Sequence, residues 1–318
     1  MKVFLTDHPW PDVAIERGIF DAAGFEFTSG PPVARPVDEI ARLVAAFQPN
    51  AIMTCWALVS ADVIATAPGL RIVQRMGVGL DNIDLAAAAA RGVVVTNVPD
   101  YCAEELSDHA VALLLSLARA MPDLDRAVKA GIWDSGRQGL RRVRDMTVGL
   151  VGYGRSGRLA AAKLAGFGVR LLAHSPSYRG DDIAQAVSLD ELLGASDAVL
   201  VHAPLTPQTH HMFDDAGIAR MKPGALLINI TRGGLIDNAA LERALDSGHL
   251  AGAGLDVVEG EPEPPPSLVR RANVVVTPHV AYSSAESITE LRTRGAQEVV
   301  RVLRGEAPEH PCPPPVAV

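Results

Sequence analysis

The sequence predicts an α/β protein that is built from two doubly wound parallel sheets. Short apolar runs alternate with helical patterns along nearly the whole chain, and this alternation is typical of β-α-β units. Aromatic residues make up only 4% of the 318 residues, and the abundant Ala, Val, Leu and Gly suit parallel strands that are covered by helices. A chain of this length can bury two separate cores.

The first third of the chain contains one series of strands and helices. Strands bounded by Gly, Pro, Asn or Asp are expected at Lys2–Leu5, Ala51–Met53, Ile72–Arg75 and Val93–Asn97. Helical patterns lie between them at Asp38–Phe47 and at the Ala-rich Leu85–Arg91. A longer apolar pattern with helical spacing follows at Glu104–Arg119, and we expect this helix to bridge two domains.

A second series of strands occupies the rest of the chain. These strands are expected at Thr147–Val151, Val169–Ala173, Ala198–His202, Ala225–Ile230, Ala251–Asp256 and Val274–Thr277. An amphipathic helix follows at Ser287–Leu303, and the proline-rich segment Pro308–Val318 is expected to be an extended surface strap. If the last helix returns to the first domain, residues 1–99 and 285–318 form a discontinuous domain, and residues 100–284 form an inserted one.

Composition excludes several classes of protein. The formal net charge of −8 argues against nucleic-acid binding, which needs a surplus of Lys and Arg. The three cysteines, Cys55, Cys102 and Cys312, show no CxxC spacing, so neither a disulfide framework nor structural zinc is expected, and a reducing cytoplasm is the expected compartment. The apolar run at the N-terminus is too short for a signal peptide, and no stretch is long enough to span a membrane.

A glycine-rich turn lies between the strand Thr147–Val151 and a helical pattern at Arg158–Ala165. Its residues are Gly152, Tyr153, Gly154, Arg155, Ser156 and Gly157. In such a turn the first glycine permits the tight bend, the second lets the backbone approach a pyrophosphate, and the third allows close helix–strand packing. The helix N-terminus then offers N–H groups to the phosphates. The position of this GxGxxG pattern therefore predicts a dinucleotide cofactor.

The end of the next strand bears on the choice between NAD and NADP. An NAD site usually carries Asp or Glu there for the ribose 2′-hydroxyl. Here His174 and Ser175 follow instead, and Ser175, Ser177 and Arg179 could hold a 2′-phosphate. This favours NADP slightly over NAD, although Arg179 pointing into water is the alternative interpretation.

Three titratable or charged residues follow predicted strand ends in the second series. Arg232 follows the strand Ala225–Ile230, Glu261 lies shortly after Ala251–Asp256, and His279 follows Val274–Thr277. The carboxyl ends of strands in an open parallel sheet form the ligand crevice. The three side chains are therefore expected to converge on one site.

Four segments together carry a resemblance to a known family. They are Asn229–Asp237, Leu255–Pro262, Thr277–His279 and Gly77–Asp84. The first three segments resemble the three signatures of the D-isomer-specific 2-hydroxyacid dehydrogenases. The fourth resembles the loop that binds the substrate carboxylate in that family. Within that family, Asp100–Glu105 and Ala281–Ser284 look closest to the C-terminal-binding-protein branch and its bacterial relatives.

The resemblance implies hydride transfer between a nicotinamide and a small 2-oxo or 2-hydroxy acid. His279 would be the general acid in reduction, because an imidazole gains and loses a proton near neutral pH. Glu261 would orient its ring, and Arg232 would grip the substrate carboxylate with its planar fork. Backbone N–H groups at Val78 and Gly79 would bind the remaining carboxylate oxygen.

The resemblance also implies a Rossmann-type cofactor domain inserted in a flavodoxin-like substrate domain, and a homodimer that pairs through the cofactor domain. Asp256 is assigned to the nicotinamide carboxamide, His109 to the cofactor surface and Thr231 to the rim beside Arg232. A turn cap is the alternative for Asp256, and a packed helix residue is the alternative for His109. Besides the glycine turn and Ser175 and Arg179, the expected cofactor-binding set is His109, His202, Ala203, Pro204, Thr231, Asp256 and His279.

Two departures from the family pattern concern specificity. The acidic residue after the second cofactor strand is missing, and Tyr282 stands where the C-terminal-binding-protein branch often has Trp. Tyr282 could line a pocket for an apolar substrate chain with Trp56 or Met76 opposite. The adjacent His210 and His211 lack ligand partners at useful spacing, so no metal site is expected.

Three functions follow from these observations. The leading hypothesis is a 2-oxo acid reductase that acts on a compound such as glyoxylate, hydroxypyruvate or a longer 2-oxo acid. The second is a nucleotide-sensing, corepressor-like binding protein with vestigial dehydrogenase activity. The third keeps the fold and changes the substrate to phosphite or another oxyanion.

Overall fold

The computed structural model describes residues 1–136 and 139–313, and the chain forms two compact units. Unit 1 consists of Met1–Tyr101 together with Ser284–Val318, and unit 2 is the inserted segment Cys102–Ser283. The last five residues of the expected surface strap, 314–318, lie outside the described part. Each unit contains a parallel sheet, so the predicted fold class is confirmed.

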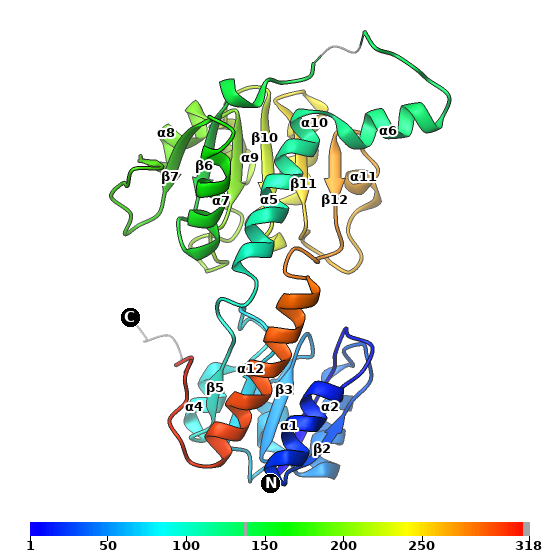
Figure 1. Ribbon diagram of the computed structural model, residues 1–318, viewed down its shortest axis with the longest axis vertical. Helices are drawn as coiled ribbons and strands as arrows, with labels where there is room; N and C mark the ends of the chain where they lie inside the picture. The colour runs from blue at the N-terminus through cyan, green and yellow to red at the C-terminus, as the bar shows by residue number, and fades with distance from the viewer. Residues whose placement is uncertain (137–138, 314–318) are drawn as a thin grey trace. The chain divides into compact units, whose positions relative to one another are not determined.

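Unit 1 is a five-stranded parallel sheet in the order β2-β1-β3-β4-β5, with helices beside it (Figure 1). This order is the flavodoxin-like doubly wound arrangement. Its elements are β1 (Lys2–Leu5), α1 (Ala14–Ala23), β2 (Glu26–Ser29), α2 (Val37–Phe47), β3 (Ala51–Thr54), α3 (Ala61–Ala65), β4 (Ile72–Arg75), α4 (Leu85–Ala90), β5 (Val94–Thr96) and α12 (Ala285–Leu303).

The C-terminal helix α12 completes unit 1. Arg292 on α12 forms a buried ion pair with Glu16 on α1, with 2.8 Å between Nη2 and Oε2. Gly295 lets the helix approach the sheet, because a Cβ there would lie 2.7 Å from the sulfur of Met76. After the helix, the backbone N–H of Cys312 donates to the carbonyl of Val95 on β5 at 2.8 Å. The two ends of the chain therefore share one core.

Unit 2 is a seven-stranded parallel sheet in the order β12-β11-β10-β9-β6-β7-β8 (Figure 1). Counted from β6, this is the 3-2-1-4-5-6 order of the Rossmann fold with one further strand. Its elements are α5 (Ala103–Ala118), α6 (Met121–Lys129), β6 (Thr147–Val151), α7 (Arg155–Ala165), β7 (Arg170–His174), β8 (Gln185–Ala186), α8 (Leu189–Ala195), β9 (Ala198–Val201), α9 (Asp215–Ala219), β10 (Ala225–Asn229), α10 (Asn238–Asp246), β11 (Leu250–Leu255), α11 (Pro266–Val269) and β12 (Val274–Val276), with short 3₁₀ turns at Val143–Asp145 and Gly233–Leu235.

Helix α5 lies wholly within unit 2, so the expectation that it bridges two domains is wrong. Leu113 and Leu117 of α5 pack where Gly252 and Gly254 of β11 leave room, since a Cβ on either glycine would lie 3.1–3.4 Å from these leucines. The apolar stripe that predicted the helix is therefore the face that covers the sheet beside α7.

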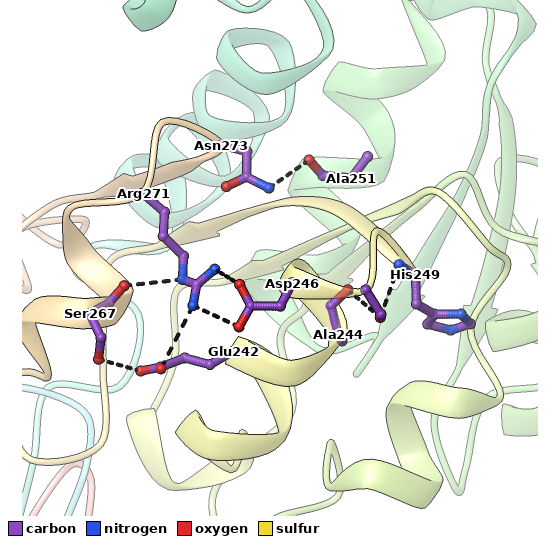
Figure 2. A network of polar contacts seen from close by, with 9 residues as sticks. Glu242, Ala244, Asp246, His249, Ala251, Ser267, Arg271 and Asn273 are labelled. Atoms are coloured by element: carbon purple, nitrogen blue, oxygen red, sulfur yellow. Dashed lines mark hydrogen bonds and ion pairs between the residues drawn. The ribbon is translucent and has the colours of Figure 1, made fainter.

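A polar network at the edge of unit 2 fixes the segment before β12 (Figure 2). The guanidinium of Arg271 binds both carboxylate oxygens of Asp246, and it lies 3.8 Å from Oε2 of Glu242. Ser267 on α11 donates to Glu242 on α10 at 2.8 Å. The network therefore joins α10 to the turn that leads into β12, and His279 follows the far end of this strand.

The sequence analysis gave no residue range for nine of the observed elements: α1, β2, α3, α6, β8, α8, α9, α10 and α11. In addition, no helix among the described residues is long and apolar enough to cross a bilayer. No disulfide joins the three cysteines, all of which lie in the described part of the chain, and Cys55 and Cys102 are buried.

Candidate active site

The candidate site starts from a row of residues at the carboxyl edge of the sheet in unit 2. Val151 pairs in register with Val201, Val201 with Asn229, Asn229 with Leu255, and Leu255 with Val276. Each of these five residues is the last of its strand, and the five strands are neighbours in the sheet. The loops that follow them therefore emerge at one edge, which is where open α/β sheets bind ligands.

The glycine turn after β6 has the shape of a phosphate cradle. Gly152 adopts φ +94°, and a Cβ there would lie 2.5 Å from the backbone nitrogen of Ala203. A Cβ on Gly157 would lie 2.5 Å from the carbonyl oxygen of Gly152. A Cβ on Gly154 would meet nothing within 4 Å, and no side chain caps the first turn of α7. The backbone at Gly154 is thus open to a ligand, and the turn fits a dinucleotide pyrophosphate.

His202, the first residue after β9, faces this turn. Its Nδ1 lies 3.1 Å from Oγ of Ser156, and only 9% of the residue is exposed. Burial lowers the pKa of His202 to about 4, so the ring is neutral at neutral pH. Its Nε2 is buried and has no hydrogen-bond partner among the described residues. A buried polar atom of this kind is what a bound ligand would satisfy. Ala203, the next residue, is buried, and Pro204 is exposed.

The segment after β7 matches the expectation of a non-acidic end. The carbonyl of His174 accepts a hydrogen bond from the N–H of Gly152 at 2.8 Å, and Ser175 is partly exposed. Arg179 is exposed, and its Nη1 donates to the carbonyls of Pro176 and Tyr178 at 2.9 Å. The guanidinium is therefore held by its own loop at the surface.

Tyr153 of the glycine turn has a buried side chain. Its ring packs on that of Tyr178 with centroids 4.2 Å apart, and the guanidinium of Arg158 lies over both rings. Arg158 also pairs with Asp181 at 3.2 Å. Tyr153 therefore offers a ligand its main chain rather than its ring. The sequence analysis did not single out Arg158 or Asp181, because no local motif marks them. Arg155 is exposed at the start of α7.

His279 and Glu261 form a direct pair. Nδ1 of His279 lies 2.7 Å from Oε1 of Glu261, with the imidazole largely covered and the carboxylate about one-third exposed. Because this bond engages Nδ1, proton exchange with a substrate would fall to Nε2. The edge of the Tyr282 ring meets the imidazole with 6.4 Å between centroids. The structure thus places these two residues, which are distant in the sequence, side by side.

The backbone of His279 is held in an unusual conformation. Its φ is +54°, which is rare for a residue with a Cβ. The N–H of His279 donates to the carbonyl of Asp256 at 2.8 Å. The buried carboxylate of Asp256 accepts hydrogen bonds from the N–H groups of Val280 and Ala281 at 2.9 and 2.8 Å. Asp256 thus caps the turn that presents His279, which is the alternative interpretation considered for this residue.

His109 extends this network from helix α5. Its Nε2 lies 2.9 Å from Oγ1 of Thr277 and 3.6 Å from Oδ1 of Asp256. The Thr277 hydroxyl in turn donates to Asp256 at 2.6 Å. The sequence analysis missed the positioning role of Thr277, which only the folded turn reveals.

Arg232 lies on a loop that packs directly against the loop of Glu261. The amide nitrogen of Asn229 donates to the carbonyl of Arg232 at 2.8 Å, and Nη1 of Arg232 donates to the carbonyl of Thr231 at 2.8 Å. A Cβ on the following residue, Gly233, would lie 2.3 Å from the backbone of Val258 and Glu259. The loops of Arg232 and Glu261 therefore touch within unit 2.

The family model for the NAD binding domain of D-isomer specific 2-hydroxyacid dehydrogenases matches residues 111–281. The chain belongs to this family. The matched range includes the glycine turn, Arg232, Glu261 and His279, so the family resemblance inferred from the four sequence segments is confirmed. The C-terminal-binding-protein branch stays a prediction.

Several known proteins are similar to most of this chain. A D-3-phosphoglycerate dehydrogenase of Mycobacterium leprae is 42% identical over 252 residues, which cover 78% of this chain and 48% of the relative. A glyoxylate reductase of Korarchaeum cryptofilum is 40% identical over 274 residues, covering 81% and 82%. A crystal structure of a Thermus thermophilus protein aligns with a TM-score of 0.90 at 33% identity, covering 98% and 99%. The chain spans about half the length of the phosphoglycerate dehydrogenase that it matches.

The segment Gly77–Asp84, the expected carboxylate-binding loop, lies in unit 1 after β4. Val78 is exposed, and its carbonyl accepts a hydrogen bond from Asn97 at 2.8 Å, while Gly79 is partly exposed. A Cβ on Gly77 would lie 2.6 Å from Nη1 of Arg75. The guanidinium of Arg75 thus lies directly beside this loop, a placement that the sequence analysis missed because Arg75 belongs to the predicted strand.

Of the two apolar candidates for a substrate side chain in unit 1, only one is exposed. Trp56 is 40% exposed, and its backbone N–H donates to Asp7 at 2.8 Å. Met76 is only 3% exposed because it is packed beneath Gly295 of α12. The expectation that Met76 could line a pocket is therefore wrong, and Trp56 remains the candidate.

Proposed function

We propose that this protein is an NAD(P)-dependent D-2-hydroxyacid dehydrogenase that works mainly as a reductase of small 2-oxo acids. The observation that carries the proposal is the pairing of His279 with Glu261 at the same sheet edge as an open glycine cradle. An oriented imidazole and a dinucleotide site are the two parts that carbonyl reduction needs.

His279 is the residue that would transfer the proton in this reaction. In reduction, Nε2 of the imidazolium donates a proton to the carbonyl oxygen, and in oxidation the neutral ring takes it back. Glu261 holds Nδ1 and stabilises the imidazolium, as a carboxylate does for the histidine of a catalytic triad. Asp256 supports this arrangement by capping the turn on which His279 lies.

Arg232 is the residue that would bind the substrate carboxylate. Its fork can bind a carboxylate in two places and also polarise the neighbouring 2-oxo group. Backbone N–H groups at Val78 and Gly79 would hold the second carboxylate oxygen. When bound, the nicotinamide supplies the hydride, and the chain contributes orientation and electrostatics.

For the cofactor we propose a slight preference for NADP. No carboxylate follows β7 directly, so nothing there repels a 2′-phosphate in the way that an acidic residue would. Ser175 and the exposed Arg179 are the groups available to bind it. Asp256 would contact the nicotinamide carboxamide, and the rest of the expected set, His109, His202, Ala203, Pro204 and Thr231, would surround the cofactor.

The proposed substrate class is a short 2-oxo acid such as glyoxylate or hydroxypyruvate. The similarity to a glyoxylate reductase along 82% of that relative supports this class. Trp56 and Tyr282 supply aromatic surface for a small apolar substituent.

The test is a panel of 2-oxo acids assayed with NADH and NADPH in parallel by the absorbance of the reduced nicotinamide. Turnover of at least one short 2-oxo acid is expected. Tight cofactor binding without turnover of any acid would contradict the proposal and favour the nucleotide sensor. Turnover of phosphite alone, assayed separately with NAD⁺ and NADP⁺ as the hydride acceptors, would favour the oxyanion oxidoreductase.

We also propose a homodimer that pairs through unit 2. In and just after helix α6, four large apolar side chains are at least half exposed: Met121, Val128, Ile132 and Trp133. Exposed apolar patches commonly mark protein interfaces. Light scattering after size-exclusion chromatography should show a dimer, and a double variant, Ile132→Ser with Trp133→Ser, should shift it toward monomer. A monomeric wild type would contradict the proposal.

A further inference from the structure

Two imidazoles and one carboxylate meet in unit 2 outside the proposed catalytic pair. Within the described residues they form the one group of three side chains, His210, His211 and Glu259, whose ligand atoms all lie within 4.8 Å of one another. Nε2 of His211 is 3.0 Å from Oε1 of Glu259, and Nε2 of His210 is 3.9 Å from the same oxygen. The two rings stack with centroids 4.0 Å apart.

The sequence analysis expects no metal site at His210 and His211 because no ligand partner lies at a useful spacing in the chain. In the fold, Glu259 is such a partner. Glu259 is 48 residues from His211 along the chain. The close packing of Gly233 against Val258 and Glu259 brings their loops together. Sequence spacing alone could not reveal this third ligand.

The backbone around the cluster is fixed from several sides. Asn238 donates to the carbonyl of Glu259 at 2.9 Å, and the N–H of His211 donates to the carbonyl of Gly234 at 2.9 Å. His211 adopts φ +49°. A non-glycine residue in this region is strained, and such residues cluster at ligand sites. This backbone conformation directs the imidazole of His211 toward Glu259.

From this geometry we propose that His210, His211 and Glu259 bind a divalent transition-metal ion of the zinc class. Two imidazole nitrogens and one carboxylate oxygen are a ligand set that zinc uses with a fourth position for water. In a tetrahedral site the ligand atoms lie about 3.4 Å apart. The His211–Glu259 pair is already close to this spacing, and the half-exposed His210 can turn inward to reach it.

An ion at this site bears on the turn that carries Glu261. Glu259 precedes Glu261 by two positions, and the N–H of Glu261 donates to the carbonyl of Val258 at 3.2 Å. An ion held by Glu259 therefore ties this turn to the loop of His210 and His211. The proposal itself is independent of the dehydrogenase function, because none of the three ligands belongs to the catalytic pair.

The experiment is calorimetric titration of the full chain with Zn²⁺, supported by the visible spectrum of bound Co²⁺. One ion per chain is expected. His211→Asn is the informative variant, because asparagine tolerates a positive φ while removing the imidazole. His211→Asn, His210→Gln and Glu259→Gln should each weaken Zn²⁺ binding by on the order of tenfold or more.

Two control variants locate the ion. His310→Gln removes a histidine in unit 1 and should leave Zn²⁺ binding unchanged. His279→Gln should also keep it, whereas loss of binding in this variant would place the ion at the catalytic pair and overturn the proposal. Absence of one-to-one binding in the wild type, or unchanged affinity in all three ligand variants, would overturn it as well.

Discussion

Nδ1 of His279 and Oε1 of Glu261 are 2.7 Å apart, although the two residues are 18 positions apart in the chain and a strand lies between them. The contact depends on two loops that leave neighbouring strands β11 and β12 at the same edge. The positive φ of His279 and the capping of its turn by Asp256 hold the imidazole in this position.

Replacing His279 with Ala should lower kcat by on the order of 10² to 10⁴, because the reaction loses its proton donor. Steady-state kinetics with the best 2-oxo acid measures the effect. Thermal unfolding serves as the control for folding, and the variant should unfold at nearly the same temperature as the wild type. Turnover close to that of the wild type would refute the role of this imidazole.

Arg232→Ala should reduce kcat and raise KM for the 2-oxo acid together, because the guanidinium is proposed to bind the carboxylate and polarise the carbonyl. Arg232→Lys is the matched variant, because it keeps the charge and loses the planar guanidinium. Its changes in kcat and KM should lie between those of the wild type and Arg232→Ala, or be nearly as large as those of Arg232→Ala. An unchanged KM in Arg232→Ala would count against carboxylate binding.

The glycine turn allows a test that separates folding from binding. Gly157→Ala should destabilise the protein by about 1–3 kcal/mol, because its Cβ would lie 2.5 Å from the carbonyl of Gly152. Gly154→Ala should fold normally, since its Cβ meets nothing within 4 Å, yet weaken cofactor binding. Thermal unfolding and cofactor titration of both variants provide the measurements. Normal cofactor affinity in Gly154→Ala would mean that no pyrophosphate approaches this backbone.

Arg179→Ala should weaken binding of NADPH more than binding of NADH, because only NADPH carries the 2′-phosphate. Arg158→Ala is a useful comparison, as that guanidinium is engaged by Asp181 and two tyrosine rings. Equal losses of NADH and NADPH affinity in Arg179→Ala would remove the argument for NADP.

The buried His202 should make stability depend on pH. Its pKa is about 4 in the folded protein, against about 6.5 in an unfolded chain. Between these values the unfolded chain holds a proton that the folded protein lacks, so the free energy of unfolding falls as pH decreases from about 6.5 to about 4. The total loss from this group is up to about 3 kcal/mol.

Urea unfolding at a series of pH values checks this expectation. His202→Gln removes the titrating ring while leaving a polar side chain of related length. The wild type should lose more stability than the variant over this pH range. Two parallel profiles would show that His202 titrates normally in the folded protein.

Much of unit 2 could be predicted from its sequence, because each buried parallel strand is a continuous apolar run followed by a turn residue. Gly152, Arg232 and His279 could be placed at one edge for the same reason. By contrast, β8 has only two residues, and α6 has no buried residue, so neither produces a clear apolar pattern.

Within the site, contacts that depend on loop packing could not be predicted. The bonds from Val280 and Ala281 to Asp256 join residues of two loops, and nothing local distinguishes this carboxylate from an ordinary one. The same holds for Glu259 beside His211, which depends on how closely Gly233 lets two loops approach. For Met76 the sequence analysis expected exposure to a substrate pocket, because the residue is apolar and lies in a loop segment. Instead, helix α12, which is distant in the sequence, covers it.

The ion pair between Glu16 and Arg292 also constrains the order of events during biosynthesis. The ribosome makes Arg292 276 residues after Glu16. Nascent chains fold domain by domain as they emerge. Residues 102–283 can therefore fold before α12 has been made, while the sheet of unit 1 still lacks this helix. In a nascent chain that is stalled before α12, Glu16 and Met76 would be exposed to solvent and to chaperones.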